Sequence, residues 1–254
     1  MTNIKILVAT HKPYWMPNES IYMPIHVGKK GKSDIGFVGD DTGNNISHKN
    51  SNYCELTALY WAWKNLEADY IGLVHYRRYF TTKTVFNVEK RKCQILSRED
   101  WERILAENPV VVADKRKYYI ESNRSHYNHA HPRAGLDIVE QIITERYSDY
   151  RMYFDLVCNR TWAHMFNMFV MRQDLFNQYC EWLFLILTDL EKRLDISSYD
   201  NYQARVFGFV AERLLDVWLE KNQIKYKEQN ISFMENQNWL KKGSIFLKRK
   251  VFGR

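Results

Sequence analysis

Short apolar runs bounded by polar residues recur along the chain and predict buried strands. Each run is too short for a buried helix of ordinary length, and the polar residues behind it mark the point where the strand leaves the core. Since parallel strands buried on both faces are apolar throughout, these runs favour a covered sheet. The predicted strands are residues 4–10, 70–74, 109–114, 164–171 and 224–228.

Other stretches show helical periodicity, with apolar residues at i, i+3, i+4 and i+7. The predicted helices are 52–65, 97–108, 172–194 and 201–222. Asn52 and Glu55 form a capping-box pattern at the start of the first helix. We expect the polar segment 115–135 to be irregular. Because strands alternate with helices, the pattern predicts an α/β domain whose helices are concentrated towards the C-terminus.

Composition places the chain among ordinary globular proteins, with 45% hydrophobic and 26% charged residues. The four cysteines are far apart and form no CxxC pair, which argues against a zinc site and a disulfide scaffold and fits a reducing compartment. No apolar stretch approaches the ~20 residues of a membrane span, and the apolar run near the N-terminus fits a strand better than a signal peptide. We therefore expect a cytoplasmic protein.

The net charge of +7 is concentrated at one end of the chain. Residues 239–254 hold six basic residues and no acidic one, interleaved with aromatic and aliphatic side chains. We expect a domain over 1–238 and a basic-aromatic tail over 239–254 that suits the inner face of an anionic membrane; a solvated or disordered tail is the alternative. Terminal charge of this kind argues against nucleic acid as a partner.

Cationic groups follow two of the predicted strands. In an open α/β sheet, ligands bind outside the carboxyl ends of the strands, and the planar arginine group pairs bidentately with phosphate oxygens. The pattern therefore predicts a diphosphate site, with a surface turn of arginines paired to acids as the alternative. No GxxxxGK[ST], GxGxxG or GxSxG motif supports a P-loop, Rossmann-cofactor or hydrolase function. The residues concerned are Thr10, His11, Lys12, His75, Tyr76, Arg77 and Arg78.

The stretches 52–65, 70–80, 164–184 and 202–219, in this order, resemble a bacterial family of capsular and exopolysaccharide glycosyltransferases that carries domain of unknown function 4422. The resemblance implies one GT-A-like nucleotide-sugar-binding domain with a mixed central sheet and C-terminal helices. It also implies transfer of a hexose from a UDP-sugar to a lipid-linked glycan in capsule, exopolysaccharide or O-antigen synthesis. Some members resemble galactofuranosyltransferases, so galactofuranose is one option for the sugar.

GT-A enzymes usually hold a divalent metal with an Asp-x-Asp motif after the corresponding strand, where this chain has His75, Tyr76 and Arg77. A metal ion needs oxygen donors, whereas cationic side chains neutralise a diphosphate directly. We therefore predict no metal ligand and no cofactor. Arg77 and Arg78, assisted by Lys12, would stabilise the leaving group, and dependence on Mn²⁺ or Mg²⁺ is the alternative.

An inverting transfer, which we expect here, needs a carboxylate base for the acceptor hydroxyl. Our candidate is Glu212, which shares a helix stripe with Arg205 and Gly208; an ion pair at Glu212 is the structural alternative. Competing candidates are Glu55, Asp40 and Asp41, and the two aspartates could equally bind sugar hydroxyls.

Further polar residues complete the predicted substrate site. His129 lies in the polar segment 115–135, where acceptor binding, a metal site and an ordinary loop are the alternatives, and His164 and Asn167 flank the predicted strand 164–171. A non-catalytic module that binds polyanions or polysaccharides is the rival function. The predicted substrate-binding residues are Thr10, His11, Lys12, Asp40, Asp41, Glu55, His75, Tyr76, His129, His164, Asn167 and Arg205.

Overall fold

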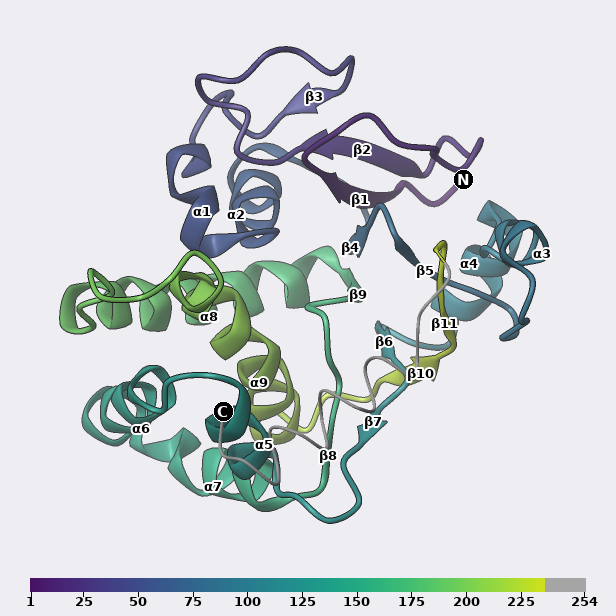
Figure 1. Cartoon of the computed structure of the whole chain (residues 1–254). Coiled ribbons are helices and arrows are strands. Elements are labelled where there is room, and N and C mark those ends of the chain that lie inside the picture. The colour runs from purple at the N-terminus through teal and green to yellow at the C-terminus, as the bar shows by residue number, and fades with distance from the viewer. Residues whose placement is uncertain (236–254) are drawn as a thin grey trace.

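A computed structural model of the chain, which describes residues 1–235, has a mixed β-sheet at its centre (Figure 1). The strand order is β10-β6-β9-β4-β1-β2-β3, and β5 and β11 extend the sheet from the end of β4. Strands β3, β2, β1, β4, β6 and β10 run in one direction and β9 in the other. The strands of this sheet are β1 (Ile4–Thr10), β2 (Tyr22–His26), β3 (Val38–Gly39), β4 (Tyr70–His75), β5 (Arg78–Phe80), β6 (Val110–Ala113), β9 (Phe169–Arg172), β10 (Lys227–Gln229) and β11 (Ile231–Phe233).

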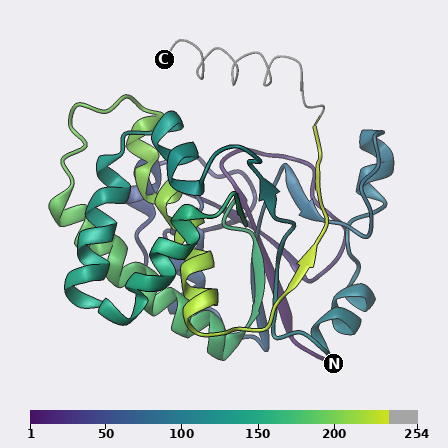
Figure 2. The ribbon, with the colours of Figure 1, turned by 90° about the horizontal axis from the view of Figure 1, so that it is seen from below.

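Helices cover both faces of the sheet, with α4 on one face and the larger group on the other (Figures 1 and 2). A separate two-stranded ribbon joins β7 (Arg116–Lys117) to β8 (Trp162–Ala163). The helices are α1 (Asn50–Tyr53), α2 (Leu56–Asn65), α3 (Val88–Lys92), α4 (Arg98–Leu105), α5 (Asn123–Ala130), α6 (Ala134–Arg146), α7 (Arg151–Asn159), α8 (Gln173–Arg193) and α9 (Val206–Lys221), with 3₁₀ turns at Ser47–Lys49, Ser148–Tyr150 and Gln203–Arg205.

Side-chain alternation along β1 explains the two layers of core. Ile6 and Val8 point into the core beneath α4, where Trp101 is fully buried. Leu7 points to the opposite face and joins the larger core formed with α2, α8 and α9. A strand buried on both faces has no polar side to present, which is why 4–10 appears in the sequence as a continuous apolar run.

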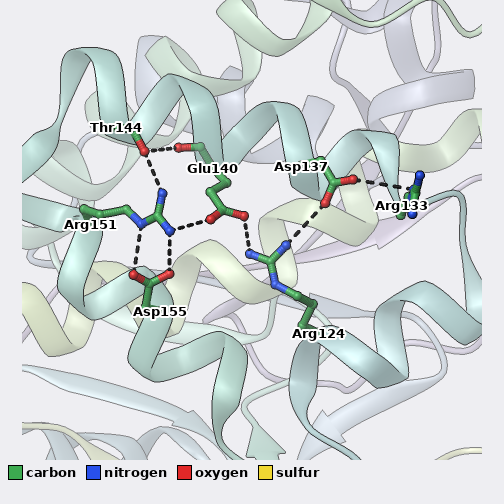
Figure 3. A network of polar contacts seen from close by, with 7 residues as sticks. All are labelled: Arg124, Arg133, Asp137, Glu140, Thr144, Arg151 and Asp155. Carbon is green, nitrogen blue, oxygen red and sulfur yellow. Dashed lines mark hydrogen bonds and ion pairs between the residues drawn. The ribbon is translucent and has the colours of Figure 1, made fainter.

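Ion pairs tie α5, α6 and α7 together at the edge of the larger helical layer (Figure 3). Glu140 of α6 accepts from Arg124 of α5 and from Arg151 of α7, each at 2.5 Å. Arg151 also pairs with Asp155 at 2.9 Å and donates to the Thr144 hydroxyl at 2.8 Å. These three short helices therefore share one charge network in addition to their apolar contacts.

The α/β fold class with a mixed sheet and C-terminal helices is confirmed. The predicted strand at 164–171 is wrong in its first half, because Phe166 and Asn167 have φ values of +78° and +51° and β9 begins only at Phe169. The segment 115–135 is less irregular than expected, since it contains α5, capped by the Ser122 side chain.

The predicted helix 52–65 is broken into α1 and α2 at Cys54, whose φ is +52°. The expected capping box does not form there, because the Asn52 side chain donates to the Ala204 carbonyl at 3.0 Å instead. Glu55 is consequently placed at the start of α2, where its side chain makes no capping hydrogen bond.

Within residues 1–235, none of the helices combines the length and the apolar character needed to cross a bilayer. The predicted tail 239–254, with its membrane contact, lies outside the described residues, as does the predicted boundary at 238.

Candidate active site

The register of the sheet gathers the predicted site at one edge. Ala9 of β1 is opposite His75 of β4, and Thr10 is opposite His26 of β2. Because β9 runs antiparallel to β4 and starts opposite Leu73, the loop that precedes it reaches the same edge. The carboxyl ends of β1 and β4 therefore meet the loop 164–168, although they are far from it in sequence.

The backbone of the loop 164–168 is fixed at two points. The Phe166 carbonyl lies 2.6 Å from Nε2 of His75, and the Phe166 amide donates to Oε1 of Glu212 at 3.1 Å. Burial lowers the pKa of His75, and the nearby Glu55 carboxylate opposes this effect. The left-handed conformations of Phe166 and Asn167 cost free energy, so they persist only where the surroundings determine them.

Asn167 links the loop to both helical elements of the site. Its Nδ2 donates to Oε1 of Glu55 at 2.7 Å and to the Gly208 carbonyl, in the first turn of α9, at 3.2 Å. The side chain is buried, and its Oδ1 has no hydrogen-bond partner among the described residues. One amide thus brings together the start of α2, the start of α9 and the loop before β9.

Glu212 is held at both oxygens. Oε1 accepts from the Phe166 amide, and Oε2 accepts from Nη1 of Arg213 at 2.9 Å. Burial raises the pKa of Glu212, the Arg213 charge opposes that shift, and the Glu55 carboxylate adds to it. The ion pair that was the structural alternative for Glu212 is therefore present.

Arg78 is a half-buried cation in contact with aromatic rings. Its guanidinium carbon lies 4.3 Å from the centre of the Phe166 ring and 5.2 Å from that of Phe233. Burial lowers the pKa of Arg78, and the carboxylates of Glu212 and Glu55 counteract it. Its Nε is buried without a hydrogen-bond partner in the described part of the chain. Such a cation is suited to receive an anion.

Arg77 is placed differently from its neighbour. The chain turns sharply after β4, and β5 returns antiparallel, with His75 opposite Arg78. Arg77 lies in this turn, and its Nε is 2.9 Å from Oε1 of Glu235. The adjacent arginines therefore differ: Arg77 has a carboxylate partner, whereas Arg78 lies against the rings of Phe166 and Phe233.

Both the sequence and the fold of this chain match known proteins. Residues 5–223 match the family model described as Domain of unknown function (DUF4422). This chain belongs to the DUF4422 family. A solved structure entitled WbbM bifunctional glycosyltransferase, in its apo form, superposes with a TM-score of 0.84 and 35% sequence identity. The match covers 92% of this chain and 46% of that one, so the DUF4422 chain spans about half of the length of that protein. None of the curated proteins matches.

The residues expected after β1 lie beside the β4–β5 turn of this DUF4422 chain. The Thr10 hydroxyl donates to the Lys12 carbonyl at 2.6 Å and so fixes the bend. The His11 ring meets the Tyr76 ring edge-on with 5.5 Å between centres, and Lys12 Nζ is 5.7 Å from the Tyr76 ring centre. These contacts place the Lys12 ammonium and the His11 ring beside Tyr76, the residue before Arg77.

Arg205 and His164 lie next to the contacts that join the loop 164–168 to α2 and α9. Arg205 precedes α9, and its Nε lies 3.0 Å from Sγ of Cys54. His164 is buried with Nδ1 2.5 Å from Oδ1 of Asp216, which lies one helical turn after Glu212. Asp216 also accepts from the His164 amide at 3.0 Å, so Glu212 and Asp216 of α9 both anchor the segment that precedes β9.

The remaining predicted residues have partners of their own. Asp40 is buried and accepts from the Gly28 amide at 2.8 Å and the Lys29 amide at 3.1 Å, which stabilises the loop after β2. Asp40 and Asp41 themselves follow β3. His129 on α5 lies 3.0 Å from Oε1 of Glu121, and the contacts that join the loop 164–168 to α2 and α9 do not include it.

Sequence reasoning missed Arg213, Asp216 and the role of Phe166. Asp216 carried a weak signal, because it lies four residues after Glu212 and so shares its helix face. Phe166 carried none, because its contribution is a backbone carbonyl and amide.

Residues after β4 do not fit a divalent cation. The side chains there are imidazole, phenol and two guanidiniums, which supply no carboxylate oxygen. In residues 1–235, no group of three or more His, Cys, Asp or Glu side chains is arranged to hold a metal ion.

Proposed function

We propose that this chain is a glycosyltransferase that transfers a hexose from a UDP-sugar to a glycan acceptor. The observation that carries this proposal is the desolvated Arg78 guanidinium, which lies at the carboxyl edge of the sheet beside the Glu55 and Glu212 carboxylates. The structural similarity to the WbbM bifunctional glycosyltransferase supports the same conclusion.

In this function Arg78 binds the diphosphate of the donor. A cation already fixed in a low-dielectric site stabilises the negative charge that develops on the leaving group without reorganising. Lys12 and Arg77 extend the positive potential along the edge towards the nucleotide, and His11, whose pKa is lowered by burial and by the Lys12 charge, contributes a neutral ring. Because carboxylate ligands for a metal are missing after β4, the transfer would be independent of divalent metal.

The finer features of the reaction are part of the proposal. We favour inversion at the anomeric carbon, a lipid-linked glycan acceptor at the inner face of the membrane, and galactofuranose as the first sugar to test. A product in capsule, exopolysaccharide or O-antigen synthesis is likewise part of the proposal, and the similarity to a bifunctional glycosyltransferase supports the transfer reaction itself.

A panel of UDP-sugars that includes UDP-galactofuranose, observed by ligand-detected NMR with and without EDTA, tests the donor and the metal together. We expect saturable binding that EDTA does not change. Arg78→Ala should weaken binding by roughly tenfold to a hundredfold, which is the range for a lost charge-assisted hydrogen bond.

Arg172→Ala is the matched control, since Arg172 is exposed at the opposite end of β9 and pairs with Asp174. It should bind donor as the unsubstituted chain does. Salt-sensitive binding of many polyanions without release of UDP would overturn the proposal and favour a binding module. Binding that EDTA abolishes and Mn²⁺ restores would overturn metal independence.

A further inference from the structure

Two carboxylates, Glu55 and Glu212, reach the site, and only one base is needed for an inverting transfer. They come from different elements and bind adjacent residues of the loop 164–168, Glu212 at Phe166 and Glu55 at Asn167. The hydrogen bonds that their oxygens accept indicate a different role for each residue.

Both oxygens of Glu212 already accept hydrogen bonds that hold the site together. Its two oxygens accept from the Phe166 amide and from Arg213, and Arg213 is itself buried. Taking up a proton there would weaken the ion pair with Arg213 and the hydrogen bond that fixes the loop. A group whose bonds hold the site together is suited to positioning rather than to proton transfer.

Glu55 has one oxygen fixed and one available. Oε1 accepts from the Asn167 amide at 2.7 Å, whereas Oε2 has no hydrogen-bond partner within residues 1–235. The residue is half-buried, so a ligand can approach it. A carboxylate oriented through one oxygen, with the other open, meets the geometric requirement for a general base.

The left-handed backbone at Phe166 and Asn167 directs the Asn167 amide to Glu55. Asn167 has a φ of +51° and follows Phe166, also left-handed, and the pair is fixed by His75 and Glu212. The strain brings the Asn167 amide to both Glu55 and the Gly208 carbonyl. Local strain of this kind is concentrated at functional sites, where it pre-organises the reacting groups.

We propose that Glu55 is the general base of the transfer and that Asn167 and Glu212 are positioning residues; this assignment rests on the proposed function. The Glu55 carboxylate takes the proton of the acceptor hydroxyl while that oxygen forms a bond to the anomeric carbon. The bond from the anomeric carbon to the diphosphate breaks, and its electron pair leaves on the phosphate oxygen that Arg78 stabilises. Glu55 then releases the proton to water.

The test compares Glu55→Gln and Glu212→Gln, which keep the size of the side chain, in donor binding, kcat, KM and the pH profile of kcat. Glu55→Gln should bind the UDP-sugar within about threefold of the parent and lower kcat by roughly 10²–10⁴, the range for a lost base. It should also remove the acidic limb of the pH profile. Glu55→Asp should recover part of kcat.

Glu212→Gln should lower the thermal midpoint and kcat but keep the acidic limb, because the proposed base Glu55 is unchanged. Asn167→Ala should lower kcat more than it changes donor binding and likewise keep that limb. The charged and titratable groups that face Glu55 are Cys54, His75, Arg78, Arg205 and Glu212, so the pH profiles of all the variants are compared over one pH range.

Two kinds of failure are distinguishable. If the unsubstituted chain neither binds nor turns over any UDP-sugar, the proposed function fails. If it turns over a UDP-sugar and Glu55→Gln keeps kcat, or if Glu212→Gln alone removes the acidic limb in a folded protein, the assignment of Glu55 fails and the proposed function stands.

Discussion

At the scale of single residues, burial decides what each ionisable group can do. Arg77 and Arg78 are adjacent and chemically identical, yet one pairs with Glu235 and the other is desolvated against the rings of Phe166 and Phe233. Desolvation strengthens the interaction of a cation with an incoming anion because water no longer screens it. Arg78 is for this reason the stronger candidate for the diphosphate.

His126 gives a stability prediction at the same scale. Its ring stacks on Tyr118 with centres 4.0 Å apart, and burial, with the charges of Arg213 and Arg116, lowers its pKa to about 3. The His131 and His129 side chains act in the same direction. In the unfolded chain the imidazole titrates near its ordinary value of 6.5.

Because the folded pKa lies below the unfolded one, the stability that depends on neutral His126 is complete above pH 6.5 and falls as the pH drops from 6.5 towards 3. The slope approaches about 1.4 kcal/mol per pH unit for one proton. Urea unfolding between pH 7.5 and 4.5 should show a shallower acid loss for His126→Phe, which keeps the stack. His48→Phe, at an exposed histidine, is the control; equal slopes for all three proteins would contradict the prediction.

At the scale of elements, close approach of β4 to β9 determines how the loop before β9 reaches the site. Gly72 permits this approach: a Cβ there would lie 2.6 Å from Cγ2 of Val170 and 2.9 Å from the Phe169 carbonyl. The Phe169 backbone cannot withdraw without disturbing the register that places Phe166 and Asn167.

Gly72→Ala should therefore destabilise the protein by about 1–3 kcal/mol, as overpacking in a core does, measured by chemical denaturation. Gly208→Ala is the contrasting variant, because the nearest atom to its Cβ would be 3.7 Å away, at Cys54. It should fold with unchanged or slightly higher stability, since alanine favours a helix. A Gly72→Ala protein as stable as the parent would show that the two strands are not packed as described.

At the scale of the whole molecule, the helical layer is joined by charges as well as by apolar contacts. Glu140, Arg124 and Arg151 connect three helices through one carboxylate (Figure 3). A network of this kind stabilises more than an isolated surface pair, because each side chain is already ordered by its other partners.

Arg151→Ala should thus lower the free energy of unfolding by about 1 kcal/mol, and less at high salt, which screens half-exposed charges. Arg172→Ala removes an equally bidentate but isolated and more exposed pair with Asp174. Its effect should be close to zero. Equal losses in the two variants, compared by urea unfolding at low and high salt, would count against the network.

The sequence by itself determined the local elements and the chemistry available to them. Continuous apolar runs fixed β1 and β4 because both faces of these strands are buried, and the residues after them had to leave the core. Helical periodicity identified α8 and α9 within a few residues. The stretches quoted for the family resemblance led to the correct family.

Only the tertiary structure decided which side chains share a site. Asn167 and Glu55 are 112 residues apart, and their contact depends on the antiparallel register of β9 and on a left-handed backbone that propensity does not predict. The same register brings the Phe166 amide to Oε1 of Glu212, whose Oε2 is bound by the adjacent Arg213, while Glu55 keeps one oxygen open. The physical reason is that hydrogen-bond partners and desolvation are properties of packed neighbours, and those neighbours come from distant parts of the chain.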